Sequence, residues 1–337
     1  MIVDTHAHLV SPELVGRVER DGARMGIRCC TDAQGTALEF AGVSRSRPLF
    51  EAMTSVAMRS EAMARAGVDL QLVSPWVDLF GYALPPEAGE AWARTLNDTL
   101  ATAIAGQRHL AGMASVPLQD GRRAARELER AVSEYGFRGV EIGTNIAGLR
   151  GLDDPDLEPF WSACEATDTA IFIHPVDALK IDRIAPFYGW NLIGNPLETA
   201  FAVTRLIFGG VLDRHPSLRI LLCHGGGHFP YQVGRLDQGY ALRPETKNTS
   251  AHPPSDYLRR FSYDSVLNAP EPLKFLLGLV GTDRVTVGTD LPFDMGDEHP
   301  SRTLDALGLN AADRARVESE NALELFRLRE GASVPGI

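Results

Sequence analysis

The chain has 337 residues, of which 44% are hydrophobic and 23% are charged, a balance that is ordinary for a soluble globular enzyme. Its formal net charge of −11 leaves no basic excess to offset phosphate groups, so we expect neither nucleic acid nor a membrane surface as a partner. The length fits two modest domains or one large α/β barrel.

The cysteine spacing and the apolar segments indicate in which cellular compartment the protein is expected. Cys29, Cys30, Cys164 and Cys223 show no CxxC spacing, which is typical of reduced thiols in a cytoplasmic protein. The chain opens directly on an apolar strand with no signal peptide before it. No apolar run reaches the roughly 18 residues that a membrane span needs. We therefore expect a cytoplasmic protein.

Two histidines follow the first predicted strand, Met1 to Thr5. Because residues two apart in a strand point to the same face, His6 and His8 are expected to project side by side. Such a pair begins a metal site, although two histidines that simply cap a sheet are an alternative. The rest of the chain has to decide between these interpretations.

Residues 9–49 lack clear periodicity and hold five glycines and a cluster of arginine and serine at 44–47. Segments this long without regular structure are usually functional or disordered. Because this one follows the histidine strand directly, we predict an insertion over the site.

From residue 50 onward, helical segments alternate with apolar runs. The predicted helices are 50–66, 86–106, 121–135, 155–167, 197–214, 270–279 and 310–328. The predicted strands after the first are 68–75, 110–116, 139–143, 170–174, 218–224, 261–265 and 285–290. Eight short buried strands separated by helices indicate a parallel (β/α)₈ TIM barrel in one domain, residues 1–337, with an insertion after strand 1. A doubly wound open sheet is the alternative, but no GxGxxG follows the first strand.

Residues able to bind metal occur where these strands end. His174 ends the fifth strand, His224 the sixth and Asp290 the eighth, as His6 and His8 end the first. In a barrel these strand ends meet at one mouth, where active sites are built. Three imidazoles and a carboxylate suit Zn²⁺ with an open position for water. His224 is then left over as an acid or base near that water.

The neighbouring residues refine this interpretation. Some related barrels bridge two metals with a modified lysine at the end of strand 4, where this chain has Glu141. We therefore expect one divalent ion, with Zn²⁺ favoured and Mn²⁺ possible. The glycines at 225–227 could let backbone N–H groups face an anion. They also make a helical pair of His224 with His228 improbable, so we assign His228 no role.

With these residues in hand, the chain resembles the amidohydrolase superfamily, and within it the branch typified by 2-amino-3-carboxymuconate-6-semialdehyde decarboxylase. The similarity runs nearly end to end. The motifs that carry it are DTHAH at 4–8, the GV–P element at 67–75, GVEIGT at 139–144, IHP at 173–175, CHGGGHFP at 223–230, GRLDQGYALRP at 234–244 and VGTDLPF at 287–293. Together they are specific for the branch and less so for the substrate.

The resemblance assigns a role to each matching residue of the centre. It implies that His6, His8, His174 and Asp290 bind the metal and that His224 activates the metal-bound water. Either His224 or Asp290 delivers the proton that completes the reaction, and this choice stays open.

The resemblance also implies how the substrate is held. Arg235 matches an arginine that reaches the substrate carboxylate from a neighbouring subunit, which implies a homodimer. Arg47 matches a second carboxylate-binding arginine, with Arg45 as its rival, and Arg243 is left open. Trp190 takes the place of an aromatic residue near the substrate, and Phe293 of the VGTDLPF motif is expected in the same pocket.

We expect a metal-dependent, non-oxidative decarboxylase of a small unsaturated or aromatic carboxylic acid. Paired arginines favour a dicarboxylate or a carboxylated ring. The alternative within the enzyme class is hydrolysis or hydration of a small carboxylated lactone, amide or unsaturated acid by the same centre. A metal-binding scaffold without catalysis is a third possibility, against which the extra histidine, His224, argues.

Overall fold

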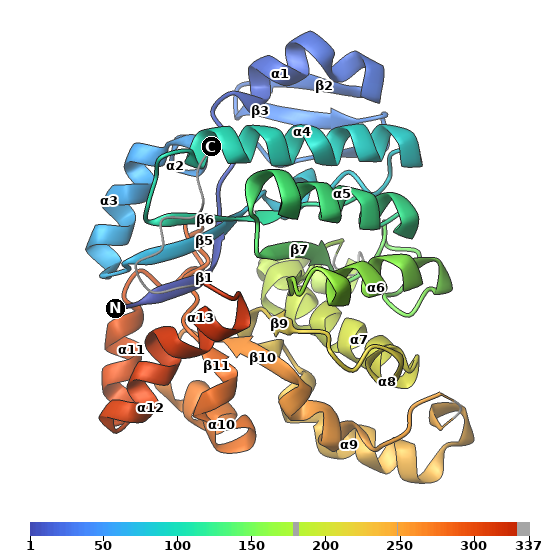
Figure 1. Cartoon of the computed structure of the whole chain (residues 1–337), viewed down its shortest axis with the longest axis vertical. Coiled ribbons are helices and arrows are strands. Elements are labelled where there is room, and N and C mark those ends of the chain that lie inside the picture. The colour runs from blue at the N-terminus through green and yellow to red at the C-terminus, as the bar shows by residue number, and fades with distance from the viewer. Residues whose placement is uncertain (178–181, 248, 329–337) are drawn as a thin grey trace.

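A computed structural model describes residues 1–177, 182–247 and 249–328 (Figure 1). Eight parallel strands lie side by side in chain order at its centre. They are β1 (Val3–His8), β5 (Leu70–Ser74), β6 (Leu110–Ala114), β7 (Gly139–Gly143), β8 (Ala170–His174), β9 (Ile220–Leu222), β10 (Phe261–Asp264) and β11 (Val285–Thr286). Seven of the predicted apolar runs contain one of these strands, and the first, Met1 to Thr5, overlaps β1, which continues to His8. The prediction of a TIM-barrel fold is confirmed.

The sheet closes between β1 and the segment that follows β11. Bridges join Asp4 to Val287 and Ala7 to Leu291, and the His8 N–H donates to the Leu291 carbonyl over 2.9 Å. This closure brings the two ends of the chain's strand series together. It therefore places Asp290, which lies within the closing segment, beside the histidines of β1.

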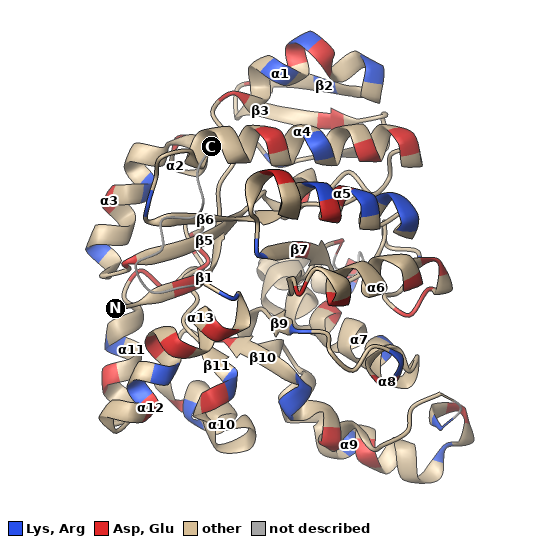
Figure 2. Cartoon of the chain, viewed as in Figure 1, with Lys and Arg blue, Asp and Glu red and all other residues tan. Residues whose placement is uncertain are grey.

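Helices surround the sheet and cover its outer face (Figure 1). They are α2 (Glu51–Thr54), α3 (Val56–Ala66), α4 (Pro86–Ile104), α5 (Gly121–Tyr135), α6 (Glu158–Ala166), α7 (Asn195–Phe208), α8 (Val211–Arg214), α10 (Pro270–Val280), α11 (Pro300–Leu307), α12 (Ala311–Ala315) and α13 (Asn321–Leu325). Local sequence sets their ends. The Asp120 side chain accepts hydrogen bonds from the N–H groups of Arg122 and Arg123 in the first turn of α5, and Gly136 ends that helix in the left-handed conformation. Figure 2 shows basic and acidic residues interspersed along α4, α5 and α12. No helix among the described residues is long and apolar enough to cross a membrane.

The core has two parts. One large apolar cluster fills the space between the strands and the surrounding helices. A second fills the barrel interior, where Val3, Phe172 and Leu221 point inward and Phe326 closes the end remote from the histidines. The opposite end of the barrel is thereby left for polar side chains.

The predicted insertion has more regular structure than its sequence indicated. It forms α1 (Leu14–Asp21) and a three-stranded antiparallel sheet of β2 (Ile27–Asp32), β3 (Gly35–Phe40) and β4 (Ser44–Arg45). Strands β2 and β3 are half-exposed hairpin strands whose apolar positions alternate weakly, which hid them from a periodicity argument.

A helix that the sequence analysis did not predict, α9 (Phe229–Leu242), follows the glycine run. It projects away from the barrel at the lower right of Figure 1. Only its first two residues are buried, so its apolar pattern carries little helical signal.

Asp4 connects three segments of the barrel around its closure. Its carboxylate accepts hydrogen bonds from Gln71 Nε2 on β5, from the backbone N–H and hydroxyl of Thr289, and from the His6 N–H. Because the carboxylate is fully buried, each donor would lose its partner without access to water if Asp4 were removed.

We predict that Asp4→Ala lowers the free energy of unfolding by roughly 3 kcal/mol, because several buried donors are left unpaired. Urea denaturation of the metal-free protein measures this change. Glu61→Ala, which removes an exposed carboxylate from α3, is the matched control and should leave stability nearly unchanged. Equal midpoints for the two variants would contradict the importance of Asp4.

Candidate metal centre and active site

The candidate site lies at the carboxyl ends of the strands. His6 and His8 lie at the carboxyl end of β1, and His174 is the last residue of β8. His224 begins the short turn after β9, and Asp290 lies four residues beyond β11. The structure therefore brings together all five residues that the sequence placed at strand ends.

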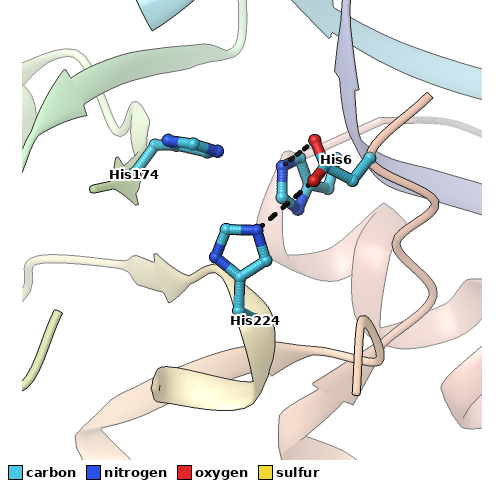
Figure 3. A group of neighbouring side chains, drawn as sticks. His6, His174 and His224 are labelled. Atoms are coloured by element: carbon cyan, nitrogen blue, oxygen red, sulfur yellow. Dashed lines mark hydrogen bonds and ion pairs between the residues drawn. The ribbon is translucent and has the colours of Figure 1, made fainter. Parts of the chain in front are cut away.

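The Asp290 carboxylate lies at the centre of this group. Its Oδ1 atom is 3.2 Å from His6 Nε2 and 3.4 Å from His8 Nε2, whereas its Oδ2 atom is 3.4 Å from His224 Nε2. The ring of His174 is centred 5.2 Å from that of His6 and 5.0 Å from that of His8. Figure 3 shows the imidazoles of His6, His174 and His224 converging on one point. One carboxylate oxygen thus faces the β1 pair and the other faces His224.

Several of the histidine nitrogens that face this point are available as metal ligands. Nδ1 of His174 donates to the Pro175 carbonyl at 2.9 Å, which leaves Nε2 as the acceptor. His6 Nε2, His8 Nε2 and His174 Nε2 are all buried without a hydrogen-bond partner. Burial lowers the pKa of His8 and, further, that of His174, so both rings are neutral, as metal ligands must be.

Charges within the cluster are coupled. Burial alone would raise the pKa of Asp290, but His6 and His224 hold it well below its usual value. Burial alone would lower the pKa of His6, but the carboxylates of Asp290 and Asp264 raise it well above its usual value. The buried Asp290 carboxylate therefore favours positive charge on His6, and a bound cation would replace the proton on that ring.

Asp264 is a member of the site that the sequence analysis missed. It ends β10, and its Oδ2 atom is 2.6 Å from His6 Nδ1. Its Oδ1 atom accepts the Gly225 N–H at 2.9 Å, next to His224. A carboxylate behind a histidine fixes the ring's tautomer and orientation. The rule that found Asp290, a polar residue at a strand end, also applies to Asp264 in the predicted strand 261–265.

Glu141 lies deeper in the barrel, on β7. Its Oε1 atom is 3.8 Å from His8 Nδ1, and donor atoms of His8, Glu141 and His174 lie within 4.8 Å of one another. Burial raises the pKa of Glu141 to about 8, so its carboxyl group is mainly neutral at pH 7. A neutral acid is a poor ligand, and Glu141 is therefore a weaker candidate than Asp290.

The backbone at His224 and Asp290 is strained. Both residues have positive φ, 51° and 57°, although neither is glycine. The Asp290 N–H is held by the His6 carbonyl at 2.8 Å, so the closure of the barrel stabilises this conformation. Such conformations concentrate at functional sites, where surrounding contacts impose them.

The N–H groups of the glycines at 225–227 all have acceptors within the protein. All three have positive φ. Their N–H groups donate to Asp264, to the Cys223 carbonyl and to the His224 carbonyl. A Cβ at Gly227 would collide with the Pro196 carbonyl. The glycines are needed for a tight turn that aims His224 at Asp290.

The residues present fit a divalent cation. Donor atoms of His6, His174, His224 and Asp290 lie within 4.8 Å of one another, and the Asp290 Oδ1 atom is also buried without a hydrogen-bond partner. Unpaired buried donors of both nitrogen and carboxylate type are costly unless an ion satisfies them. Imidazole nitrogens with a carboxylate are a donor set that divalent transition metals and zinc prefer.

A cavity of about 810 Å³ opens above this cluster and reaches His174, His224 and Asp290 at its floor. Its walls include Trp190 and Phe293, both predicted, and Trp76, which was not assigned a role. Such a concave site with aromatic walls suits a planar organic molecule. The insertion contributes Ser44 and Arg45 of β4 to the lining of the cavity.

The predicted arginines divide into two groups. Arg47 and its rival Arg45 both line the cavity, and the Arg47 guanidinium lies 4.7 Å from the Trp76 ring and 5.3 Å from the Trp190 ring. Arg235 is exposed on α9 and does not line this cavity. Arg243, at the end of α9, pairs with Glu245 at 2.6 Å. The structure of one chain thus leaves Arg235 outside the site.

These features define a metal-binding TIM barrel with its centre at the strand ends. The sequence matches the model of the amidohydrolase family over residues 3–328, and the chain belongs to that family. The sequence-based recognition is confirmed.

Several relatives share this architecture. The chain is 35% identical over 274 residues to 2-amino-3-carboxymuconate-6-semialdehyde decarboxylase of Dictyostelium discoideum, covering 80% of this chain and 76% of the relative. It is 34% identical over 256 residues to gamma-resorcylate decarboxylase of Rhodococcus jostii, covering 70% and 76%. The solved structure of 5-carboxyvanillate decarboxylase from Sphingomonas paucimobilis matches with a TM-score of 0.80 at 27% identity, covering 97% and 99%. These similarities confirm the prediction that the chain is an amidohydrolase of the decarboxylase type.

We predict that Asp264→Asn weakens binding of a divalent metal by about 10- to 100-fold, because the amide no longer fixes the His6 ring. Competition with a chromophoric chelator measures the change. Asp256→Asn, an exposed carboxylate remote from the cluster, should bind metal like the wild type. Unchanged affinity in Asp264→Asn would show that the ring needs no such support.

Proposed function

We propose that this protein is a metal-dependent, non-oxidative decarboxylase that acts on a small aromatic or unsaturated carboxylic acid. The observation that carries the proposal is the position of the unpartnered metal donors at the floor of an aromatic-walled cavity. Relatives of three different substrate specificities, all described as decarboxylases, share the fold or the sequence. We also propose that residues 1–337 form one catalytic domain in a cytoplasmic protein, a proposal that the four free cysteines support.

In this proposal His6, His8, His174 and Asp290 hold one divalent ion, which would polarise a bound substrate oxygen. Zn²⁺ is our first candidate because three imidazoles and one carboxylate form the set. Mn²⁺ is the second, since a dihydroxybenzoic acid decarboxylase of the same fold from Polaromonas sp. is described with manganese bound.

His224 and Asp290 are the proposed proton-handling groups. His224 Nδ1 is buried without a hydrogen-bond partner, and its Nε2 atom faces Asp290. When the carbon–carbon bond breaks, its electron pair stays on the substrate carbon, carbon dioxide departs and a proton must be delivered to that carbon. A histidine beside a carboxylate at the cavity floor can supply that proton.

The substrate is proposed to lie between aromatic walls. Trp190 and Phe293 would contact its ring, and Arg47 lies against both of them, 5.3 and 5.9 Å from their ring centres. A flat conjugated acid presents the face that such walls bind.

The proposed assembly is a homodimer in which the partner subunit's Arg235 holds the substrate carboxylate. Helix α9 supports this because it projects from the barrel with Arg235 and Tyr231 exposed, Tyr231 by 78%. Tyr231 lies beside Phe275 of α10, which is half-exposed, so an apolar surface adjoins the arginine.

We predict that metal-loaded protein releases carbon dioxide from at least one member of a panel of hydroxybenzoates and carboxylated muconates. His224→Ala should lower kcat by about 10²- to 10⁴-fold while it retains one metal per chain, because only proton handling is lost. Coupled detection of bicarbonate and elemental analysis provide the two measurements. A metal-loaded wild type that adds water to these acids without losing carbon would instead support a hydratase.

We predict that Arg235→Ala and His224→Ala, each nearly inactive alone, regain activity when they are mixed and allowed to exchange subunits. A mixed dimer has one complete site, so equal mixing restores about a quarter of the wild-type sites. Light scattering after size exclusion reports the assembly. Full activity of Arg235→Ala, or no recovery in the mixture, would contradict a shared site.

A further inference from the structure

The guanidinium of Arg47, a residue that lines the cavity, is already paired with a carboxylate. Its Nε and Nη2 atoms donate to the two oxygens of Asp78, each over 2.9 Å, and its backbone N–H donates to Asp78 Oδ2 over 2.9 Å. This is a bidentate pair in which guanidinium and carboxylate lie edge to edge. It uses one edge of the guanidinium and leaves Nη1 as the donor that Asp78 does not engage.

The aromatic residues hold this pair in place. The Arg47 guanidinium lies near Trp76, Trp190 and Phe293, and the Trp76 and Phe293 rings are centred 5.8 Å apart. Trp76 is only 2% exposed, and Asp78 follows two residues later in the turn Val77–Leu79. The position of Asp78 is thus set by a buried aromatic anchor, and Arg47 is fixed in turn.

The charges along the cavity also matter. Among the described residues, the cavity is lined by two arginines, Arg45 and Arg47, and by five aspartates, Asp78, Asp177, Asp182, Asp290 and Asp294. Arg45 is itself paired with Asp32 at 2.5 Å. Both arginines are therefore matched by a carboxylate, and the described wall carries no positive excess of its own.

We infer that Asp78 is a specificity-determining residue: by cancelling the charge of Arg47, it makes the site prefer substrates with one carboxylate, the group that is lost, and a neutral oxygen substituent near Arg47. The inference rests on the proposed function. Of the two substrate classes that the paired arginines were expected to favour, a dicarboxylate or a carboxylated ring, it selects a ring with a single carboxylate. The partner subunit's Arg235 is assigned to the departing carboxylate, so Arg47 is the group that would meet a second one.

The physical reason is electrostatic. A second carboxylate at Arg47 would gain the attraction of the guanidinium but meet the repulsion of Asp78 at similar range. A hydroxyl, ether or carbonyl oxygen needs only a hydrogen bond, which Nη1 can donate. Such a group loses little from the presence of Asp78.

Two nitro compounds that cannot lose carbon dioxide separate the charge effect from catalysis. 2-Nitrophenol carries a nitro group in place of the departing carboxylate, and 4-hydroxy-3-nitrobenzoate adds one further carboxylate to the same ring. Calorimetric titration into metal-loaded protein, at a pH at which both phenols are fully ionised, gives the ratio of their affinities. Wild type should bind 2-nitrophenol the more tightly.

Asp78→Asn should shift this ratio about tenfold toward the carboxylated compound, because Arg47 keeps its charge and loses its counter-charge. Asp78→Ser should act in the same direction. Asp283→Asn, which breaks a bidentate pair with Arg259 on the outside of the barrel, makes the same change in net charge and should leave the ratio unchanged.

A wild-type preference for the carboxylated compound, or equal losses for both compounds in the two Asp78 variants, would overturn the inference and leave Asp78 as a structural residue. Metal content and melting temperature show that each variant is folded and loaded. Failure of the proposed function is seen separately, as absence of carbon dioxide release from the acids themselves, because the nitro compounds report binding alone.

Discussion

A buried carboxylate that needs a cation dominates this structure. Asp290 contacts His6, His8 and His224, which come from opposite parts of the chain. An anion withdrawn from water is expensive unless positive charge or hydrogen bonds surround it. The protein places imidazoles on both oxygens, and Nε2 of His6, Nε2 of His8 and Nδ1 of His224 are buried without a hydrogen-bond partner. This arrangement leaves buried polar atoms without hydrogen bonds, but it suits the binding of a divalent ion.

The closure of the barrel supplies the geometry. Arg59 of α3, 1% exposed, donates to the Leu291 carbonyl over 2.9 Å and also to the His8 carbonyl. It thereby ties the end of β1 to the segment that carries Asp290. Asp4 ties the same two segments one layer deeper. These contacts explain how a residue with positive φ, Asp290, is held in a strained conformation beside two histidines. The contacts that close the barrel are thus also the contacts that position Asp290.

The sequence was sufficient for the barrel and for most of the candidate centre. Buried parallel strands are short apolar runs, and residues at their ends share one mouth, so His174 and Asp290 could be placed without coordinates. Asp264 was within reach of the same rule. Asp78 was not, because its role depends on a contact with Arg47 across 31 positions of chain that no periodicity reports. The hairpin of the insertion and α9 were missed for a related reason, since neither buries a regular apolar face.

Family membership and local chemistry determine different properties of this protein. The fold and the relatives define a decarboxylase-type amidohydrolase, while the pairing of Arg47 with Asp78 distinguishes how this cavity treats a second negative charge. We propose that one divalent ion joins β1 to the closing segment. Anomalous diffraction from metal-loaded crystals would locate that ion. We expect a single strong peak within about 2.0–2.3 Å of the ligand atoms of His6, His8, His174 and Asp290. A peak away from Asp290, or none in this cluster, would contradict it.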